Sequence, residues 1–175
     1  LLAEEPLSSS VVRSMSVADN LALRNFDEPG MTTLGGWFVR RKAIREQGER
    51  LIREYGIRTQ GPDTLIETLS GGNVQRSLLA RELSEEVSLL IAQNPCLGLD
   101  LSAVAEIRNR ILAIRNQGAS VLLISEDLDE ILQLADRILV MFNGRIVHET
   151  TREQADVATL GRYMAGQNVE PEEAE

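Results

Sequence analysis

Two short apolar runs, each followed by a helical pattern, constrain the fold of this chain most strongly. Residues 88–92 and 121–124 have the length and composition of buried strands. In the segments that follow these runs in sequence, apolar residues recur at helical spacing: Val104, Ile107, Ile111 and Ile114 after the first run, and Leu128, Ile131, Leu132 and Ala135 after the second. Because strands that alternate with helices form parallel sheets, the sequence predicts an α/β fold with parallel strands.

The segment that follows these elements in sequence is predicted to form a β-hairpin. Asn143 and Gly144 separate two strand-like segments, 137–142 and 145–147. Both residues tolerate the positive φ of a tight turn, so the two strands are expected to pair antiparallel. A last helix is predicted over residues 152–164.

The first half of the chain is predicted to be mainly helical. Ser16 and Asp19 resemble the cap of a short helix, and residues 41–55 form an amphipathic pattern. A loop is expected between these helices, up to about Trp37, and a further helix is expected from Gly71 onward. The predicted division of the chain is an irregular segment 1–15, an α-helical subdomain 16–87, an α/β segment 88–165 and a disordered acidic tail 166–175.

Composition excludes several classes of protein. The net charge of -9 over 175 residues argues against a nucleic-acid-binding protein, because phosphate neutralisation needs a clustered basic surface. Basic residues cluster once, between Arg40 and Arg53, and are interpreted as a solvated helix face rather than a phosphate or membrane patch. The single cysteine, Cys96, excludes an internal disulfide, and no Cys/His cluster predicts a metal site. The single cysteine fits a cytosolic protein. No run approaches the roughly 18 consecutive apolar residues of a spanning helix, so any membrane connection is expected to run through a partner.

The run Ser70, Gly71 and Gly72, at the start of a predicted helix, has the chemistry of an anion-binding bend. The hydroxyl can donate, the glycines permit close backbone approach, and the helix N-terminus carries partial positive charge. The competing interpretation is a plain turn in which Ser70 caps the helix. A phosphate loop with Gly-Lys-Ser/Thr is not found, because the only lysine, Lys42, lies in the basic helical stretch. The chain is therefore expected to hold half of a nucleotide site.

From about residue 14 to residue 164 the chain resembles the nucleotide-binding domain of ABC transporters. Four features in the family's order carry the resemblance: the signature at residues 69–75, the strand end at residues 92–95, the D-loop at residues 98–100, and residues 123–128 with the hairpin behind them. The sequences of these motifs are most similar to those of the second, degenerate ATPase domain in the fused subunits that import sugars and nucleosides. The resemblance implies a C-terminal fragment with a partial P-loop NTPase core and no P-loop, in which residues 1–15 are a remnant of the lid-loop region. Glu4 there would contact a transmembrane partner or would be merely an exposed acid.

The sequence departs from this family at the positions that carry catalysis. The resemblance implies Asp-Glu at the end of the strand before the D-loop, the Walker B motif, where this chain has Gln93 and Asn94. The family's switch histidine is replaced by Glu126, and the only histidine, His148, is interpreted as an ordinary strand residue. Because an amide cannot act as a base and binds Mg²⁺ poorly, no catalytic or metal-binding residue is predicted in this chain.

The residues that act in trans are intact. The resemblance implies that Ser70, Gly71, Gly72 and Gln75 contact an ATP held by a facing domain. Asp100 would bridge the two domains, or cap the helix that follows it, or do both. Trp37 is expected to pack within the helical subdomain, with docking of a membrane-subunit helix as the alternative.

The sequence therefore predicts part of the ATP-binding subunit of an ABC importer for sugars or nucleosides. The resemblance implies ATP and Mg²⁺ as cofactors of the full assembly, with none bound to this chain alone. The implied partners are the preceding nucleotide-binding domain, of the same or a paired subunit, and the permease subunits, on the inner face of the membrane. The parent subunit is expected to be an ATPase, whereas the chain alone is expected to be inactive and to self-associate through uncovered sheet edges. Two alternatives stay open: an inactive ABC-fold interaction module, and a soluble ABC-type ATPase, although such ATPases usually keep Asp-Glu before the D-loop.

Overall fold

The computed structural model describes residues 2, 6–33, 36–84 and 87–167, which belong to two compact units, Leu1–Ile124 and Ser125–Glu175. Glu4 and residues 168–175 of the predicted tail lie outside the described residues. No helix in the described ranges is long and apolar enough to cross a membrane. The four-part division expected from the sequence stays a prediction.

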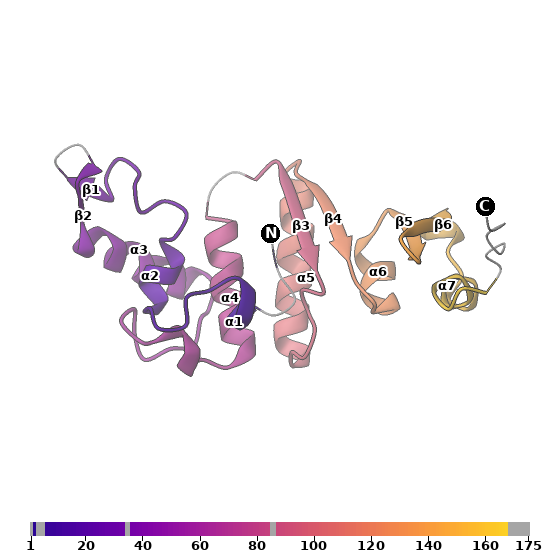
Figure 1. Cartoon of the computed structure of the whole chain (residues 1–175), viewed down its shortest axis with the longest axis horizontal. Helices are drawn as coiled ribbons and strands as arrows, with labels where there is room; N and C mark the ends of the chain where they lie inside the picture. Colours follow the sequence, from indigo (N-terminus) through magenta and orange to yellow (C-terminus); the bar gives the residue numbers. More distant parts are fainter. Residues whose placement is uncertain (1, 3–5, 34–35, 85–86, 168–175) are drawn as a thin grey trace. The chain divides into compact units, whose positions relative to one another are not determined.

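The helices of the first unit surround a central helix, α4 (Gly71–Glu82). All side chains from Asn73 to Ala80 on α4 are buried. Figure 1 shows α4 between α2 (Val17–Leu21) and α3 (Arg41–Glu54) on one side and strand β3 (Leu89–Gln93) with helix α5 (Leu101–Asn116) on the other. A short helix, α1 (Pro6–Ser9), and a 3-10 turn, η2 (Ile66–Thr68), complete this part.

Local sequence accounts for the bounds of α2 and α3. Ser16 Oγ accepts a hydrogen bond from the Asp19 backbone N–H at 3.1 Å, so the predicted cap of α2 is confirmed. In α3 the buried face carries Ile44 and Leu51, and the helix ends before Gly56, whose φ of 59° suits glycine. The basic residues on the other face are exposed and paired with carboxylates, as predicted for a solvated face: Arg41 with Asp19, Lys42 with Glu46, Arg45 with Glu49 and Asp63, and Arg50 with Glu54.

The helices α2 and α3 approach each other closely at Gly48. A Cβ atom on Gly48 would lie 2.7 Å from Ala18 Cβ and 3.1 Å from Ala18 Cα. Since Ala18 belongs to α2, only a shift of the helices could make room. Glycine at this position is therefore required by the packing of the first unit.

Replacing Gly48 with alanine is expected to lower the free energy of unfolding by about 1–3 kcal/mol, the usual cost of overpacking a core. The matched control is Gly61→Ala, because a Cβ on Gly61 would meet nothing within 4 Å. Urea unfolding followed by circular dichroism measures both variants. Equal stability of the two would contradict the helix contact.

The strands of the first unit form a parallel pair, as predicted. Strand β3 (Leu89–Gln93) pairs in register with β4 (Ser120–Ile124), from Leu89 opposite Ser120 to Gln93 opposite Ile124. The helix α5 (Leu101–Asn116) connects them and ends before Gly118, at φ 103°. Exposed apolar side chains remain on both strands: Leu89, Leu122 and Ile124.

The segment expected to be irregular, residues 1–15, contains ordered structure at two places. Leu2 is fully buried and pairs with β3, because its N–H donates to Ile91 O at 2.9 Å and its carbonyl accepts from Gln93 N at 2.9 Å. Pro6–Ser9 form the one-turn helix α1. Such short elements have no sequence periodicity, because their order comes from tertiary contacts.

The second unit has a hairpin with helices before and after it. Strands β5 (Arg137–Phe142) and β6 (Arg145–Thr151) pair antiparallel around Asn143 and Gly144, whose φ values of 47° and 76° confirm the predicted turn. Helices α6 (Leu128–Leu134) and α7 (Val157–Met164) flank the hairpin in sequence. The core of this unit contains Ile138, Val140 and Leu160.

The last helix begins later than the sequence indicated. Residues Arg152–Gln154 form a separate 3-10 turn, η3, and α7 starts at Val157. The Asp156 carboxylate accepts a hydrogen bond from Thr159 N at 2.8 Å and so caps α7. The cap formed by Asp156, which lies within the predicted helical pattern of residues 152–164, therefore sets the start of α7.

A small antiparallel ribbon, β1 (Thr32–Thr33) and β2 (Phe38–Val39), occupies the segment expected to be a loop. The ribbon has no buried face, and Trp37, just before β2, is 85% exposed. The expectation that Trp37 packs within the subdomain is therefore wrong. The core begins only at Met31 and Ile44 on either side of the ribbon.

Candidate functional site

The predicted anion-binding bend, which we call the signature bend (Ser70, Gly71 and Gly72), lies on the surface at the start of α4. Ser70 and Gly71 are exposed and Gly72 is half-buried. The Ser70 carbonyl accepts from Asn73 N at 2.9 Å and Val74 N at 3.0 Å, which begins the helix. The first N–H groups of a helix have no acceptor within the helix. The bend therefore directs backbone donors away from the body of α4.

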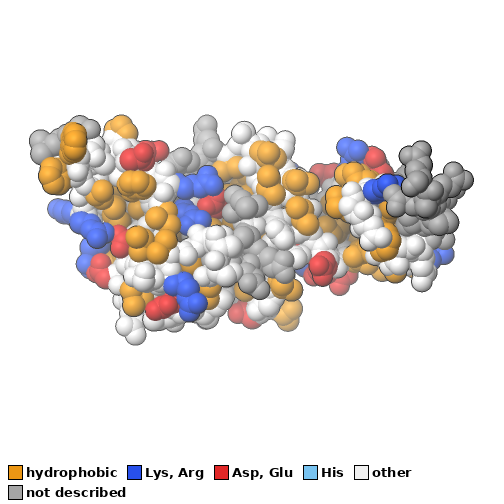
Figure 2. Space-filling view, in the orientation of Figure 1, with side chains coloured by type: hydrophobic (Ala, Val, Ile, Leu, Met, Phe, Trp, Pro, Cys, Tyr) orange, Lys and Arg blue, Asp and Glu red, His pale blue; other side chains and the backbone are white. Residues whose placement is uncertain are grey.

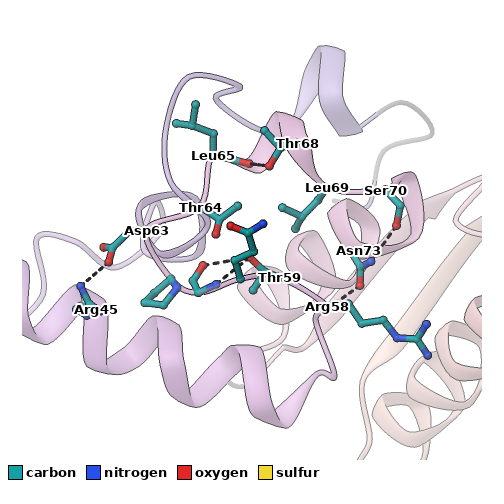
Figure 3. A pocket seen from close by; sticks show the side chains of 13 residues that line it. Arg45, Arg58, Thr59, Asp63, Thr64, Leu65, Thr68, Leu69, Ser70 and Asn73 are labelled. Atoms are coloured by element: carbon teal, nitrogen blue, oxygen red, sulfur yellow. Dashed lines mark hydrogen bonds and ion pairs between the residues drawn. The ribbon is translucent and has the colours of Figure 1, made fainter.

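Ser70 occupies the cap position, but its side chain makes no hydrogen bond to the helix backbone. Its Oγ instead accepts a hydrogen bond from Asn73 Nδ2 at 2.8 Å (Figure 3). The interpretation of Ser70 as a simple helix cap does not account for this contact.

The orientation of the Asn73 amide is fixed by two donors. Asn73 Oδ1 accepts from the backbone N–H of Arg58 at 2.8 Å and from Arg76 Nη1 at 3.3 Å. Since both groups can only donate, the oxygen must face them and the NH₂ group must face Ser70. Ser70 Oγ is thus the acceptor in its bond with Asn73, and the hydroxyl hydrogen is left to donate to another group.

The two glycines of the signature bend are not required by the chain's own packing. A Cβ on Gly71 would meet nothing within 4 Å, and one on Gly72 would reach an ordinary contact, 3.6 Å from Ala103 Cβ. Neither glycine has a positive φ. Because glycine within a helix costs roughly 0.5–1 kcal/mol relative to alanine, the fold alone gives no reason for two of them. Close approach of another molecule would supply the reason.

An open hollow of about 960 Å³ lies beside the signature bend (Figure 3). Its wall is formed largely by the loop from Arg58 to Leu65, together with Ser70 and Asn73. At the rim, Arg45 forms an ion pair with Asp63. Asn73 therefore connects the wall of the hollow, through Arg58, to the hydroxyl of Ser70.

Gln75 does not share the exposure of the signature bend. The residue is only 4% exposed, and its Nε2 donates to Pro95 O at 3.1 Å. Its Oε1 is buried and has no hydrogen-bond partner among the described residues. The side chain points into the first unit because it lies one turn along α4, on the face that packs against the loop after β3. The contact of Gln75 with an ATP in trans stays a prediction.

Asp100 lies at the start of α5 and caps that helix. One carboxylate oxygen, Oδ1, accepts from Ala103 N at 2.9 Å, and the residue is exposed. Ala103 and Leu99 are also the residues nearest to Gly72. The structure thus brings the signature bend and the predicted D-loop together on one unit.

The end of β3 carries no carboxylate. Gln93 is the last residue of the strand and is exposed, and Asn94 follows with a positive φ of 41°. Asn94 N donates to Ile124 O at 2.7 Å. Asparagine is among the few residues that readily adopt this backbone, which is a structural reason for its presence. No cluster of three or more His, Cys, Asp or Glu that could hold a metal ion occurs within the described ranges.

The remaining predicted positions lie in the second unit. Glu126 is exposed in the turn before α6, next to Asp127, whose Oδ1 accepts from Asp129 N at 2.9 Å and caps the helix. His148 lies in β6 and its ring stacks on Tyr163, with ring centroids 4.3 Å apart. The interpretation of His148 as an ordinary strand residue is confirmed.

Sequence comparison relates the chain to ATP-binding proteins of import systems, although no family model matches it. The glucose import ATP-binding protein of Haloferax volcanii is 40% identical over 154 residues, which are 87% of this chain and 28% of that protein. The nucleoside import ATP-binding protein of Lactococcus lactis is 36% identical over 166 residues, 95% of this chain and 32% of that protein. The arabinose import ATP-binding protein of Shigella boydii is 38% identical over 156 residues, 89% and 30% of the two chains. The chain thus spans 28–32% of the length of these relatives.

Structural comparison gives the same relationship at the level of the fold. A dimeric ATP-binding cassette in a post-hydrolysis state, bound to ADP and Pi, matches with a TM-score of 0.68 and 16% identity, over 86% of this chain and 61% of that chain. A dimeric bacterial ABC transporter cassette matches with a TM-score of 0.66 and 18% identity, over 83% and 60% of the two chains. By sequence and by fold, therefore, this chain is related to the ATP-binding proteins of sugar and nucleoside ABC importers.

Proposed function

We propose that this chain supplies its signature bend to an ATP molecule held by a second nucleotide-binding domain, within the ATP-binding subunit of an importer for sugars or nucleosides. The observation that carries the proposal is the hydrogen bond from Asn73 Nδ2 to Ser70 Oγ, which leaves the Ser70 hydroxyl hydrogen available to an outside acceptor. The two glycines, whose absent side chains leave the bend open, support it.

The chemistry of the bend fits the terminal phosphate of a nucleotide. Negative charge on the transferred phosphoryl group is spread over its oxygens, and positioned O–H and N–H donors stabilise that charge. Ser70 would donate its hydroxyl hydrogen, and Gly71 and Gly72 would present backbone N–H groups at the positive end of α4. The solved cassettes that share this fold are dimeric, and one holds ADP and Pi, which is the kind of arrangement that the proposal requires.

The chain's own nucleotide site is proposed to be inactive. Gln93 and Asn94 supply amides where a base and a Mg²⁺ ligand would be needed, and Glu126 would place a negative charge where the family's histidine faces the phosphate. ATP and Mg²⁺ would then be bound by the facing domain, where Mg²⁺ neutralises the charge of the phosphates. Gln75 enters the proposal as the residue that ties α4 to the loop after β3. Asp100, which caps α5, would also face the second domain.

The partners follow from this role. The facing nucleotide-binding domain would belong to the same or a paired subunit, and permease subunits would hold the assembly at the cytoplasmic face of the membrane. The relatives named for glucose, arabinose and nucleoside import support sugars or nucleosides as the transported class. The exposed apolar residues Leu89, Leu122 and Ile124 support the expectation that the chain alone self-associates.

The isolated chain is expected to release no phosphate from ATP and Mg²⁺ above the level of its Ser70→Ala variant. The reason is that the bend completes a site whose remaining parts lie on another domain. A coupled phosphate-release assay at several protein concentrations measures the rate. Turnover that Ser70→Ala abolishes would contradict the proposed division of roles, since the chain would then hold a complete site.

A further inference from the structure

The most exposed aromatic surface of the described chain lies far from the signature bend in sequence and has no role in the proposed function. Trp37 is 85% exposed, Phe38 is 63% exposed, and Val39 is 43% exposed. They are consecutive, and the first two are among only six aromatic residues of Phe, Trp and Tyr type in the whole chain. Side chains of this size are rarely left in water without a partner.

Basic residues follow these side chains directly. Arg40, Arg41 and Lys42 come next, and no acidic residue occurs between Met31 and Arg45. The chain as a whole has a net charge of -9, whereas this segment carries a net positive charge. Figure 2 shows hydrophobic atoms at the β1–β2 end of the first unit with basic side chains close by. We call the residues Trp37, Phe38, Val39, Arg40 and Lys42 the ribbon patch.

The cationic groups of the ribbon patch make only weak contacts within the described chain, so an external anion can replace their partners. Lys42 is 89% exposed by its side chain, and its Nζ lies 3.8 Å from a Glu46 oxygen that is itself exposed. Exposed ion pairs of this kind contribute little, so an external anion can replace the carboxylate. The Arg40 guanidinium donates to a backbone carbonyl, Gly30 O, at 3.3 Å.

We propose that the ribbon patch binds the surface of a membrane rich in anionic lipid, with Trp37 and Phe38 entering the headgroup region and Arg40 and Lys42 facing lipid phosphates. Exposed aromatic residues beside basic ones have the chemistry of a membrane interface, where amphipathic rings sit at headgroup level and each cation adds attraction. The patch is a projecting two-stranded ribbon and not part of the hollow beside Ser70, so its shape suits a deformable surface. Carboxylates more than roughly 10 Å away are largely screened at 0.1 M ionic strength, and the nearby Glu46 forms only the weak exposed ion pair with Lys42. The proposal goes beyond the proposed function and shares no residue with it. At Arg40 and Lys42 it departs from the interpretation of the basic stretch as a solvated helix face only.

Trp37 allows a direct test, because it is the only tryptophan of the chain. The probes are vesicles of phosphatidylglycerol mixed with phosphatidylcholine, and vesicles of phosphatidylcholine alone. Tryptophan emission is expected to move to shorter wavelength with the anionic vesicles only, and the movement is expected to reverse at high salt. No movement with anionic vesicles, or equal movement with both kinds, would overturn the proposal; in the first case a protein surface would be the better candidate partner.

Charge variants test the location of the binding. Arg40→Gln combined with Lys42→Gln is expected to weaken anionic-vesicle binding by about thirtyfold, from the usual contribution of two cations at a membrane surface. The matched control is Arg50→Gln with Arg53→Gln, which changes the net charge equally but lies about 12 Å or more farther along α3. Both pairs are exposed, and circular dichroism checks that each variant stays folded. Equal loss of binding in the two double variants would overturn the assignment to the ribbon patch.

Discussion

Replacing Ser70 with alanine in the complete ATP-binding subunit is expected to lower kcat for ATP hydrolysis by about 10²–10³-fold, the usual loss when one donor to a developing charge is removed. The expected effect on KM is much smaller, because the donor acts mainly on the charge of the transition state. Steady-state phosphate release by the subunit assembled with its permease measures both constants. The free energy of unfolding is expected to change little, since Ser70 is exposed and makes no helix-cap bond.

Two further variants on α4 make this result specific. Ser77→Ala removes a hydroxyl from the same helix, one that is buried and donates to Asn73 O at 2.8 Å, and is expected to affect stability more than turnover. Gly71→Ala is expected to leave the fold intact, because the added Cβ meets nothing within 4 Å, and yet to reduce turnover by blocking the approach of a phosphate. If Ser70→Ala turned over ATP at the unmodified rate, the signature bend would have no catalytic role.

The second large effect is expected from Asn73→Asp. The carboxylate can still accept from Arg58 N and Arg76 Nη1, so the contacts that hold the loop to α4 are kept. Toward Ser70, however, the donor NH₂ becomes an acceptor oxygen, and the Ser70 hydroxyl would turn its hydrogen to that oxygen and away from the phosphate. Turnover is expected to fall by roughly 10²-fold, comparable to the loss of the Ser70 donor itself.

The double variant separates orientation from a general disturbance of the fold. If Asn73 acts through Ser70, adding Asn73→Asp to Ser70→Ala is expected to cause little further loss of kcat. Asn73→Ala is the structural comparison, because it removes the acceptor of the part-buried Arg58 N–H and of the buried Arg76 Nη1. It is expected to destabilise the first unit by about 1–3 kcal/mol. Fully additive losses in the double variant would show that Asn73 does not orient the hydroxyl.

The regular part of the fold could be predicted because its elements have a clear period. The apolar runs that became β3 and β4, and the Asn143–Gly144 turn, are local signals that depend on few distant contacts. The ribbon β1–β2 could not be predicted, since strands of two residues show no alternation. Leu2 joins β3 through contacts about ninety positions away in sequence, which no local pattern encodes.

The candidate site was predictable in part for the same reason. Two glycines after a serine mark a bend whatever surrounds it, and Ser70 and Gly71 are indeed exposed. The burial of Gln75 could not be predicted, because α4 is covered on nearly all sides and a helical pattern does not show which polar residues face inward. The role of Asn73 was missed because its acceptor is used by Arg58, in a loop 15 positions earlier in the chain. The asparagine beside the two glycines is the signal that could have suggested it.

The burial of α4 has a consequence for any molecule that meets its first turn. Since side chains from Asn73 to Ala80 are enclosed by neighbouring elements, rotamers and backbone there are already ordered in the folded chain. Association with a rigid, preorganised donor group loses less conformational entropy than association with a loop that must first be arranged. Weakening the interior of this helix is therefore expected to raise the entropic cost of docking even where every donor atom is retained.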